Sequence, residues 1–593
     1  MSPRAITLSA ALSLLTVTAA ADITVDSNTR VVLDAQDQIS ADLFGLTAFE
    51  GFPQVVSDRD YRARVASLRP GCIRFGGSIG WCAPGEFDPA WYETDAASRE
   101  FTQPLLFGAK YPFGRFLPIV RELGAEPMFS FGQPPGYVLQ EGTVNPSDFD
   151  QWAELCAAYV GLWKRFDPDF RLVQIWNEPN ATWFRDPRAN DEGTSAADLH
   201  ITMANKVASA IKERYPDVLV GGPVLCWPPC WPANQTGQKP WYTWHQWTLP
   251  WLNQTAETMD FFDFHAYDIA PDDLAVQVEM VANQSEITQG RRIPIWITES
   301  NSILSPTPEQ LADPAEIWRN RVIPYERFLL RGVLPQADKI AGNLYHDLHA
   351  NRHTLLPGSA FAPDPSYWML WILRDARGAR VVADSDDPEV VSYATVEEDA
   401  LTVIILNDSD AEKTVPLNAN VSPGWWTGPY TRAIGEGESG TVERIGVTAE
   451  LQRDGSWARG QVVLPAHATA SITFRMQGFR TPSRARVTRE HFGDAVLRFF
   501  EGAEPVTVTI HAPEVGDAEP RLRLGLLGTK GTERWTATLN GEPVELESRA
   551  YQELSIDANL LEAQNRLEIR LDEATDNPAL ALGFAALVFE TTE

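Results

Sequence analysis

Between residues 43 and 373 the chain alternates short apolar runs with longer amphipathic stretches. Eight runs have the length of buried strands, and helical periodicity lies between most of them. Eight strands alternating with helices predict an α/β fold, a (β/α)8 TIM barrel. An open doubly wound sheet is the competing architecture, but no early strand precedes the glycine-rich phosphate turn of such sheets. The expected strands are Leu43–Ala48, Cys72–Gly76, Pro127–Phe131, Leu172–Trp176, Val218–Gly222, Phe261–Tyr267, Ile293–Thr298 and Ile340–Tyr345, and the clearest helices are Asp150–Phe166, Ala196–Tyr215, Leu274–Ile287 and Ala315–Leu330.

After residue 380 the pattern changes to apolar–polar alternation with turn residues and little helical periodicity, which predicts β-sandwiches. We expect the barrel domain to span residues 22–378, a β-sandwich to span 379–477, and a jelly-roll-like β-sandwich to span 488–593. The basic, proline-containing stretch 478–489 has the composition of a linker. Residues 22–34 form a strand-like segment that could pair with the sandwich that follows the barrel.

The first residues have the features of a secretory signal peptide. Arg4 precedes the apolar run Ala5–Val17, and small residues follow at Ala19–Ala21. A membrane anchor or a buried first strand are the alternatives, but the run is too short to anchor. We expect residues 1–21 to be removed and the mature chain to be secreted or periplasmic.

The net charge of −31 is spread along the chain rather than concentrated in a tail. Nucleic acids and anionic membranes attract basic patches, so the composition argues against both as partners. The five cysteines suggest the disulfides Cys72–Cys82 and Cys226–Cys230, with Cys156 free. A metal site is the alternative for Cys226 and Cys230, but a second ligand pair at zinc spacing is missing.

Two glutamates end predicted barrel strands. Glu178 follows the fourth strand within Asn177-Glu178-Pro179-Asn180, and Glu299 follows the seventh strand. Reactive groups of barrels gather at these C-terminal strand ends, so the two carboxylates should face each other. Such a pair can cleave a glycosidic bond, because one protonated and one ionised carboxyl group are needed. Most glutamates are surface groups, and Asn-Glu-Pro can arise by chance, but both residues at these strand ends favour catalysis.

With these motifs the chain resembles the retaining glycoside hydrolases of clan A, whose catalytic glutamates end strands four and seven. The resemblance implies that Glu178 is the acid/base and Glu299 the nucleophile. Ile73-Arg74-Phe75-Gly76-Gly77 is similar to the strand-two motif whose arginine contacts the nucleophile, so Arg74 would keep Glu299 ionised. Asn177 would hydrogen-bond the sugar 2-hydroxyl.

Further polar residues at strand ends are expected to contact the sugar. His265 and Tyr267 end the sixth strand and share one face of it, and Tyr345 and His346 end the eighth. Core packing is the alternative for the histidine and tyrosine of strand six. This chemistry requires no cofactor and no metal ion, although His265, His346 and His349 could make a metal-dependent hydrolase.

Aromatic side chains are frequent in the predicted loops. Trp81 and Trp183 are expected to bind sugar rings, whose apolar C–H faces pack on aromatic groups. The tryptophans between Trp227 and Trp251 could extend this surface to several sugar units, or they could be core residues.

Several clan A families share a barrel followed by a sandwich, namely the xylosidase/iduronidase, arabinofuranosidase and β-glucuronidase families. The β-agarase and β-porphyranase family carries two sandwiches, which matches the layout here. The sequence therefore predicts a secreted retaining glycoside hydrolase that acts on a polysaccharide or oligosaccharide by double displacement. Endo action as in the agarases and exo action as in the xylosidases both stay open. A non-catalytic carbohydrate-binding protein is the alternative of another class.

Overall fold

The computed structural model describes residues 22–592 outside a set of shorter segments, and the N-terminal stretch with the expected signal peptide lies outside the described residues. The other segments left out are 34–37, 49–57, 78–84, 103–112, 133, 140–144, 185–194, 231–240, 303–306, 308–313, 349–354, 357–362, 422–424, 437–441, 445–447, 478–481, 483, 501–503, 513–517 and 573–578. Within the described part, no helix combines the length and the apolar character needed to cross a bilayer.

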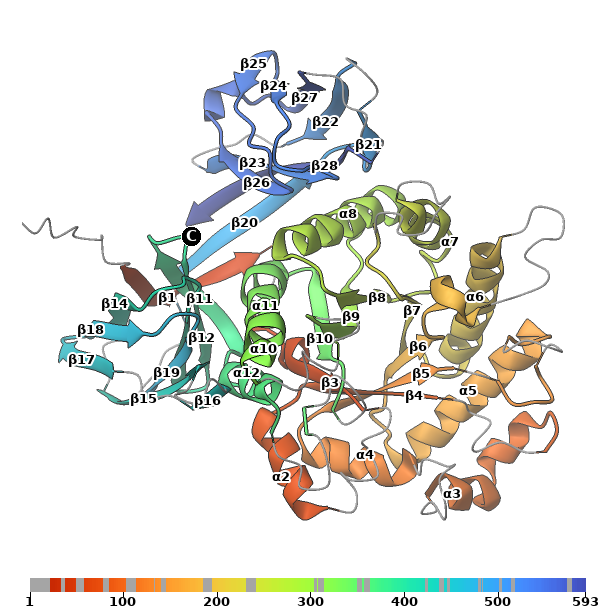
Figure 1. Cartoon of the computed structure of the whole chain (residues 1–593). Helices are drawn as coiled ribbons and strands as arrows, with labels where there is room; N and C mark the ends of the chain where they lie inside the picture. Colours follow the sequence, from red (N-terminus) through yellow and green to blue (C-terminus); the bar gives the residue numbers. More distant parts are fainter. Residues whose placement is uncertain are drawn as a thin grey trace, which may run out of the picture.

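Eight parallel strands close into a barrel with helices around it, which confirms the predicted fold class (Figure 1). The barrel strands are β3 (Gly45–Thr47), β4 (Cys72–Gly77), β5 (Glu126–Phe131), β6 (Leu172–Ile175), β7 (Leu219–Leu225), β8 (Phe261–Tyr267), β9 (Ile295–Asn301) and β10 (Ile340–Tyr345). The surrounding helices include α2 (Arg59–Leu68), α3 (Asp95–Thr102), α4 (Phe113–Glu122), α5 (Phe149–Phe166), α6 (Ala196–Arg214), α7 (Leu249–Gln254), α8 (Pro271–Gln289), α10 (Pro314–Ile317), α11 (Ile323–Arg327) and α12 (Pro365–Leu373). Short π-helical turns separate α10 from α11 and follow α11, so the expected helix Ala315–Leu330 is not regular.

Local sequence explains where two of the three longest helices, α5 and α6, begin. The Asp148 carboxylate accepts the backbone N–H groups of Asp150 and Gln151 at 2.9 and 3.1 Å, which caps α5. Ser195 and Asp198 form a reciprocal capping box at the start of α6. These caps satisfy N–H groups that have no partner inside the helix, so each helix starts at a defined residue.

Side chains fill the barrel interior in layers. The lower layer is an apolar cluster of Cys72, Met128, Leu172, Phe261, Trp296 and Leu344. Glycine makes room for its two largest members, because a Cβ atom on Gly221 or Gly342 would lie 2.1 Å or 2.3 Å from the rings of Phe261 and Trp296. Polar side chains stand above this layer, toward the C-terminal strand ends: Thr47, Arg74, Ser130, Gln174, Asp263 and Thr298.

The first β-domain is a sandwich. One sheet has the order β16-β15-β19-β13-β12-β11-β1, and β14, β18 and β17 form the opposing layer around a common apolar core. The first strand, β1 (Ile23–Leu33), belongs to this domain, where it pairs antiparallel with β11 and parallel with β14. The remaining strands are β11 (Gly378–Ser385), β12 (Val390–Glu397), β13 (Ala400–Asn407), β14 (Lys413–Asn420), β15 (Trp425–Glu436), β16 (Val442–Arg444), β17 (Thr448–Asp454), β18 (Trp457–Leu464) and β19 (Thr469–Gln477).

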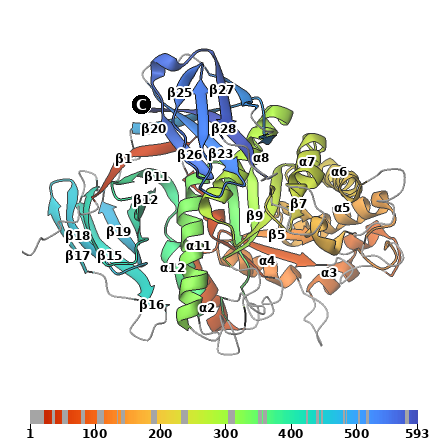
Figure 2. The same ribbon diagram turned by 45° about the horizontal axis from the view of Figure 1, so that its top comes forward.

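A second β-domain completes the chain and stands beside α8 (Figures 1 and 2). Its core lies between the sheet β20-β28-β23-β26 and the four-stranded sheet β22-β27-β24-β25. Its strands are β20 (Arg484–Phe492), β21 (Arg498–Phe499), β22 (Val506–His511), β23 (Glu519–Leu527), β24 (Trp535–Leu539), β25 (Glu542–Val544), β26 (Tyr551–Ser555), β27 (Gln564–Leu571) and β28 (Ala581–Thr592).

The second half of the stretch expected to be a linker is instead a strand. Residues 484–489 belong to β20, which pairs with β1 on one side and β28 on the other. The second half of β1 thus joins the two β-domains into one continuous sheet. The proline and the basic residues suggested a linker. The alternating pattern of the strand is short and its partner strands are distant in sequence, so the sequence pattern did not identify it.

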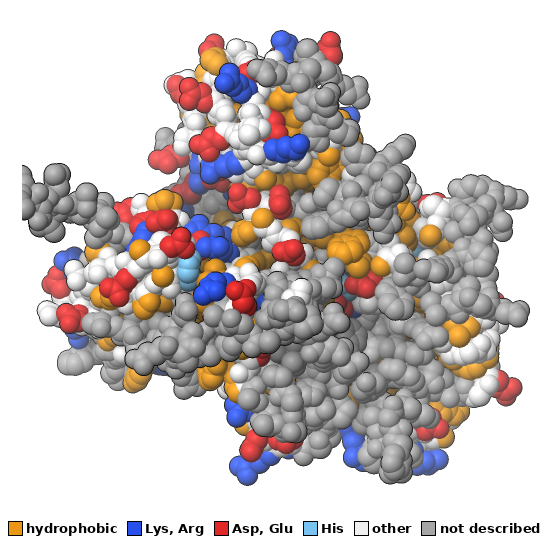
Figure 3. Space-filling model, in the orientation of Figure 1, with side chains coloured by type: hydrophobic (Ala, Val, Ile, Leu, Met, Phe, Trp, Pro, Cys, Tyr) orange, Lys and Arg blue, Asp and Glu red, His pale blue; other side chains and the backbone are white. Residues whose placement is uncertain are grey.

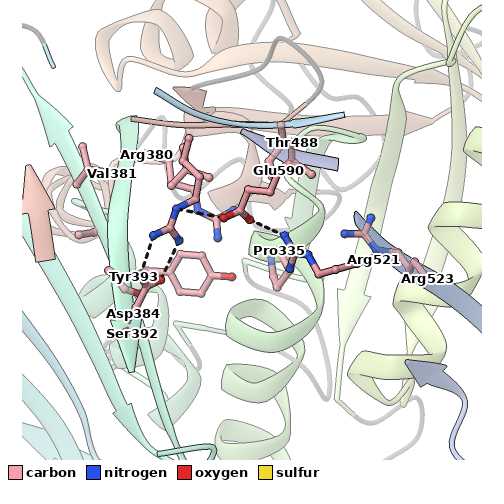
Figure 4. A pocket seen from close by; sticks show the side chains of 15 residues that line it. Pro335, Arg380, Val381, Asp384, Ser392, Tyr393, Thr488, Arg521, Arg523 and Glu590 are labelled. Carbon is pink, nitrogen blue, oxygen red and sulfur yellow. Dashed lines mark hydrogen bonds and ion pairs between the residues drawn. The ribbon is translucent and has the colours of Figure 1, made fainter. Parts of the chain in front are cut away.

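An ion pair joins the two β-domains beside the barrel. A pocket there is lined by residues of β1, β11, β12, β20, β23 and β28, and Figure 4 shows the charged side chains that cross it. Arg486 contacts Asp384 at 2.9 Å and Glu590 at 3.5 Å, and Glu590 also contacts Arg521. Elsewhere on the face seen in Figure 3, acidic and basic side chains are interspersed over both β-domains.

A deeper ionic cluster holds the second β-domain against the barrel. Glu490 of β20, only 3% exposed, contacts Lys339 at 2.9 Å, Arg292 at 3.3 Å and Arg523 of β23. Lys339 and Arg523 also both contact the buried Glu279 of α8. The charges of barrel and β-domain therefore neutralise one another around the buried carboxylates of Glu490 and Glu279.

Replacing Glu490 by glutamine is expected to destabilise the protein by about 3–5 kcal/mol, because three cations would lose a buried counter-charge. Chemical unfolding followed by tryptophan fluorescence measures the effect. Asp399→Asn is the control, since Asp399 and Arg475 form a pair that is more than half exposed, and it should change stability by less than about 1 kcal/mol. Equal effects of both substitutions would show that the buried cluster does not hold the domains together.

Candidate active site

Glu178 is turned into the barrel mouth by a strained strand end. Trp176 and Glu178 have φ values of +75° and +50°, which residues other than glycine rarely adopt. The backbone N–H of Glu178 donates to the carbonyl of Val224 at the end of β7, at 2.9 Å. The neighbouring strand therefore holds the residue in a conformation that points its carboxylate away from the barrel wall.

Glu299 reaches the same place through a β-bulge. The pairing of β8 with β9 shifts by one residue, since Phe264 is opposite Ile297 but His265 is opposite Glu299. The extra residue is Thr298, which points into the barrel and donates its hydroxyl to Asp263 at 2.7 Å. In a regular strand, Glu299 would then point outward, so the bulge is what directs it inward.

Arg74 organises the floor of the site. The side chain is fully buried, and its guanidinium group donates to the Glu299 carboxylate at 2.7 Å. It also donates to Asn177 Oδ1 at 2.7 Å, Gln174 Oε1 at 2.5 Å and Ser130 Oγ at 3.4 Å. The fork of donors thus positions both the expected nucleophile and the expected sugar-binding amide.

The surroundings of Glu299 favour its ionised form. Its second oxygen accepts a hydrogen bond from the hydroxyl of Tyr267 at 2.7 Å. Burial by itself would raise the pKa of the Glu299 carboxyl, but neighbouring groups outweigh burial and hold the pKa well below its ordinary value. The opposing groups, from the largest contribution, are His265, His346, Arg74 and Tyr267.

His265 stands between the two glutamates. Its Nδ1 lies 3.0 Å from Glu178 Oε1 and 3.5 Å from Glu299 Oε2, and the ring is fully buried. The Glu178 side chain keeps 19% of its surface exposed, against 8% for Glu299. One carboxyl group is therefore open to solvent and ligand, while the other is enclosed and ion-paired.

The rim of the site includes the predicted His346 together with Thr47 and Cys226, which the sequence analysis did not identify. His346 lies 3.7 Å from Glu299 and is held by the Thr47 hydroxyl, 3.0 Å from its Nδ1. The thiol of Cys226 hydrogen-bonds the Glu178 carboxylate, and burial together with this carboxylate raises the pKa of the thiol. Cys226 follows β7 directly, and its position at a strand end was the signal that could have placed it here.

Tyr345 does not line the mouth, which corrects the prediction from sequence. The preceding Leu344 belongs to the cluster inside the barrel. Because side chains alternate along a strand, Tyr345 points outward into the helix layer. There its hydroxyl accepts a hydrogen bond from Arg321 at 3.2 Å, and its ring packs on Tyr325.

The aromatic predictions have mixed outcomes. Trp81, the Trp183 side chain and His349 lie outside the described residues. The expected sugar platform between Trp227 and Trp251 is wrong for four of its tryptophans, because each is at most 5% exposed and belongs to the barrel core. These four are Trp241, Trp244, Trp247 and Trp251.

The expected disulfides are also wrong. Cys72, Cys226 and Cys230 are free and buried, as is Cys156, and Cys82 lies outside the described residues. Cys72 points into the apolar layer of the barrel interior, while Cys226 turns toward Glu178. Proximity in sequence did not pair Cys226 with Cys230, and both thiols are free.

Donor atoms of Glu178, His265 and Glu299 all lie within 4.8 Å of one another. A metal ion could in principle use three such atoms, but both Glu299 oxygens already accept hydrogen bonds from Arg74 and Tyr267. A second cation beside the Arg74 guanidinium would also be repelled. The donor set is therefore that of a hydrogen-bonded carboxylate pair, and we assign no metal ligands here.

Comparison with known proteins agrees with this fold. Residues 146–319 match the family model described as glycosyl hydrolase catalytic core. A variant of BuGH86 in complex with neoagarooctaose superposes with a TM-score of 0.71 at 14% identity, over 96% of this chain and 98% of that one. The β-porphyranase BpGH86A of glycoside hydrolase family 86 from Bacteroides plebeius gives 0.68 at 14% identity, over 96% and 100%. The GH39 enzyme from Xanthomonas axonopodis pv. citri gives 0.53 at 15% identity, over 77% and 97%.

A search of curated proteins finds no match. The solved structures come from families of clan A glycoside hydrolases, and they share the fold of this chain. Together with the matching family model, which includes both Glu178 and Glu299, they support the assignment of the chain as a glycoside hydrolase.

Tyr267→Phe is expected to lower kcat/KM for a glycoside substrate about 10- to 100-fold, because Glu299 would lose a hydrogen bond to a charged group. Tyr345→Phe is the matched control and should leave kcat/KM within about twofold, since its hydroxyl lies behind the barrel wall. Steady-state kinetics of both variants measures the difference. A larger loss in Tyr345→Phe than in Tyr267→Phe would contradict the placement of the two tyrosines.

Proposed function

We propose that the protein is an exported, retaining glycoside hydrolase that cleaves O-glycosidic bonds by double displacement. The observation that carries the proposal is the pair of carboxylates at the mouth. The nearest oxygens of Glu178 and Glu299 are no more than 4.8 Å apart. Retaining enzymes need a short separation of about 5–5.5 Å, whereas inverting enzymes leave about 6.5–9.5 Å for a water molecule.

The environments of the two carboxyl groups suit different roles. Glu299, ionised beside Arg74, attacks the anomeric carbon and forms a covalent glycosyl-enzyme, while the bond to the leaving oxygen breaks. Glu178, the more exposed group, donates its proton to that oxygen. A water molecule then attacks the anomeric carbon, Glu178 takes a proton from it, and the bond to Glu299 breaks. Asn177, oriented by Arg74, is placed to bind the sugar 2-hydroxyl.

The proposed substrate class is a polysaccharide or its oligosaccharides. Similarity to GH86 structures over 96% of the chain, including both β-domains, supports endo action on an agarose- or porphyran-like glycan. Exo action of the xylosidase or arabinofuranosidase type is the alternative, because similarity to a GH39 enzyme extends over 77% of the chain. A non-catalytic carbohydrate-binding protein would bind the glycan without cleaving it.

The test uses the purified protein with agarose, porphyran, xylan and arabinan, followed by aryl glycosides of the sugar that is released. Oligosaccharide products indicate endo action and monosaccharides indicate exo action. We expect Glu178→Ala to lower kcat/KM about 10²- to 10⁴-fold and Glu299→Ala to abolish turnover. Glu213→Ala, an exposed glutamate on α6, is the control and should keep wild-type activity.

Azide distinguishes the roles of the two glutamates. With an activated aryl glycoside, azide should rescue Glu299→Ala and give a glycosyl azide of inverted configuration, because azide replaces the nucleophile. In Glu178→Ala, azide should intercept the glycosyl-enzyme and give the retained configuration. Wild-type activity in both variants would overturn the proposal, and loss of activity in a chelator would instead favour the histidine-based metal hydrolase. Glycan binding without cleavage by the wild type would favour the binding protein.

A further inference from the structure

The segment that carries Glu178 lies beyond the regular pairing of β6 with β7. The last residue of β6 in that pairing is Gln174, which is opposite Gly221. Glu178 comes four residues later, immediately before the short helical turn Pro179–Trp183. The position of the expected acid/base therefore depends on contacts that are made after the ladder between the two strands has ended.

One of these contacts uses the backbone of Glu178 itself. Val224 is the extra residue in a bulge of β7 against β8, and its φ is +58°. The bulge takes Val224 out of the regular ladder, and its carbonyl accepts the Glu178 N–H at 2.9 Å instead. This bond holds the segment at Glu178 but leaves the residues that follow it to other partners.

The second contact uses the side chain of Asn180, two residues after Glu178. Its Oδ1 accepts the backbone N–H of Cys226 at 2.8 Å, and this hydrogen bond is partly buried. Because the partner is an N–H group, the amide atom that faces it must be the oxygen. The thiol of Cys226 in turn contacts the Glu178 carboxylate. The residue that Asn180 holds is therefore itself a neighbour of the acid/base.

We propose that Asn180 is a positioning residue for Glu178: its side chain supplies the next link between β6 and β7 and so fixes the segment from which the acid/base projects. Asparagine side chains can bond backbone groups that a regular ladder does not reach. With the Val224 bond, the Asn180 bond keeps the Glu178 carboxylate beside His265, whose Nδ1 is 3.0 Å away. This inference rests on the proposed function, because the position of Glu178 matters for catalysis only if Glu178 transfers protons.

The two glutamates differ in how much they depend on such support. Glu299 is enclosed, and its two oxygens are held by Arg74 and Tyr267. Glu178 keeps 19% of its side-chain surface exposed, so its carboxylate has space to move within the mouth. A proton donor has to stay within hydrogen-bond reach of the leaving oxygen. Loss of the Asn180 bond should therefore impair proton donation and leave the nucleophile in place.

The dependence of kcat/KM on the leaving group tests this expectation, with aryl glycosides of the sugar that the wild type releases. Asn180→Ala should lower kcat/KM for a phenyl glycoside about 10- to 100-fold, because a poor leaving group needs an accurately placed proton donor. A dinitrophenyl glycoside needs little proton donation, so its kcat/KM should fall by less than about threefold. Asn180→Asp keeps an acceptor oxygen and should restore most of the loss at its own pH optimum. A loss of equal size for both glycosides, or no loss for either, would overturn the proposal.

Asn205→Ala is the matched control. Asn205 of α6 is a partly buried asparagine whose side chain donates to the backbone carbonyl of Gln254 at 3.1 Å. Because this bond lies in the helix layer, its loss should leave kcat/KM for both glycosides within about twofold of the wild type. The same leaving-group dependence in Asn205→Ala as in Asn180→Ala would show a general effect of a lost hydrogen bond and would contradict a positioning role.

Hydrogen exchange followed by mass spectrometry tests the role of Asn180 without a substrate. In Asn180→Ala, peptides that include residues 172–184 should exchange about 10-fold faster than in the wild type, because opening the segment no longer breaks the bond to Cys226. Peptides of α8 should be unchanged. Unchanged exchange at residues 172–184 would show that the Val224 bond is sufficient and would overturn the proposal. A wild type that cleaves nothing would refute the proposed function, while the exchange result would still decide whether Asn180 holds the segment.

Discussion

A guanidinium group that is completely buried inside a barrel is stable only if anions and oriented dipoles surround it. Arg74 meets this condition through Glu299 of β9 and through Gln174 and Asn177, which lie in β6 and just beyond its end. The requirement determines much of the site, because satisfying the arginine places one carboxylate and one amide at fixed positions on the floor of the mouth. It also makes Glu299 the ionised member of the pair. The exposed carboxyl group, Glu178, is left to exchange protons with whatever enters.

The backbone directs these side chains by departing from regular strand geometry. A bulge at Thr298 lets two successive residues of β9 point inward. Thr298 contacts Asp263, and Glu299 faces the mouth of the barrel. At the end of β6, Trp176 and Glu178 also depart from strand geometry, with positive φ values. Such features cost energy, and the apolar layer beneath the site, packed around Phe261 and Trp296, supplies a rigid base for them. Catalytic geometry of this kind needs support within about half an ångström.

The two β-domains pack against the barrel and share one sheet. Residues of both domains belong to the apolar cluster that surrounds the barrel, and β1 runs from one domain into the other. Charges at the barrel surface are neutralised by Glu490 and Arg523 from the second β-domain. A carbohydrate-binding module on a flexible tether would show few such contacts. The arrangement favours a bracing role, in which the domains hold the helices and strand ends of the barrel in place.

Sequence periodicity by itself determined the barrel, the change to β-domains and the strand ends where Glu178 and Glu299 lie, because hydrophobic alternation and strand order are local signals. Tertiary structure alone decided which side chains at those ends point inward. Tyr345 was misplaced because strand parity depends on where the barrel interior lies. Cys226 and Cys230 do not pair, because Cys226 turns toward Glu178 instead. The tryptophans near residue 245 are buried by helices packed against the barrel, a contact between segments that no local pattern records. Cys226 and Asp263 gained their neighbours only when the strands closed into a barrel, because proximity across a barrel depends on the shear and tilt of all its strands.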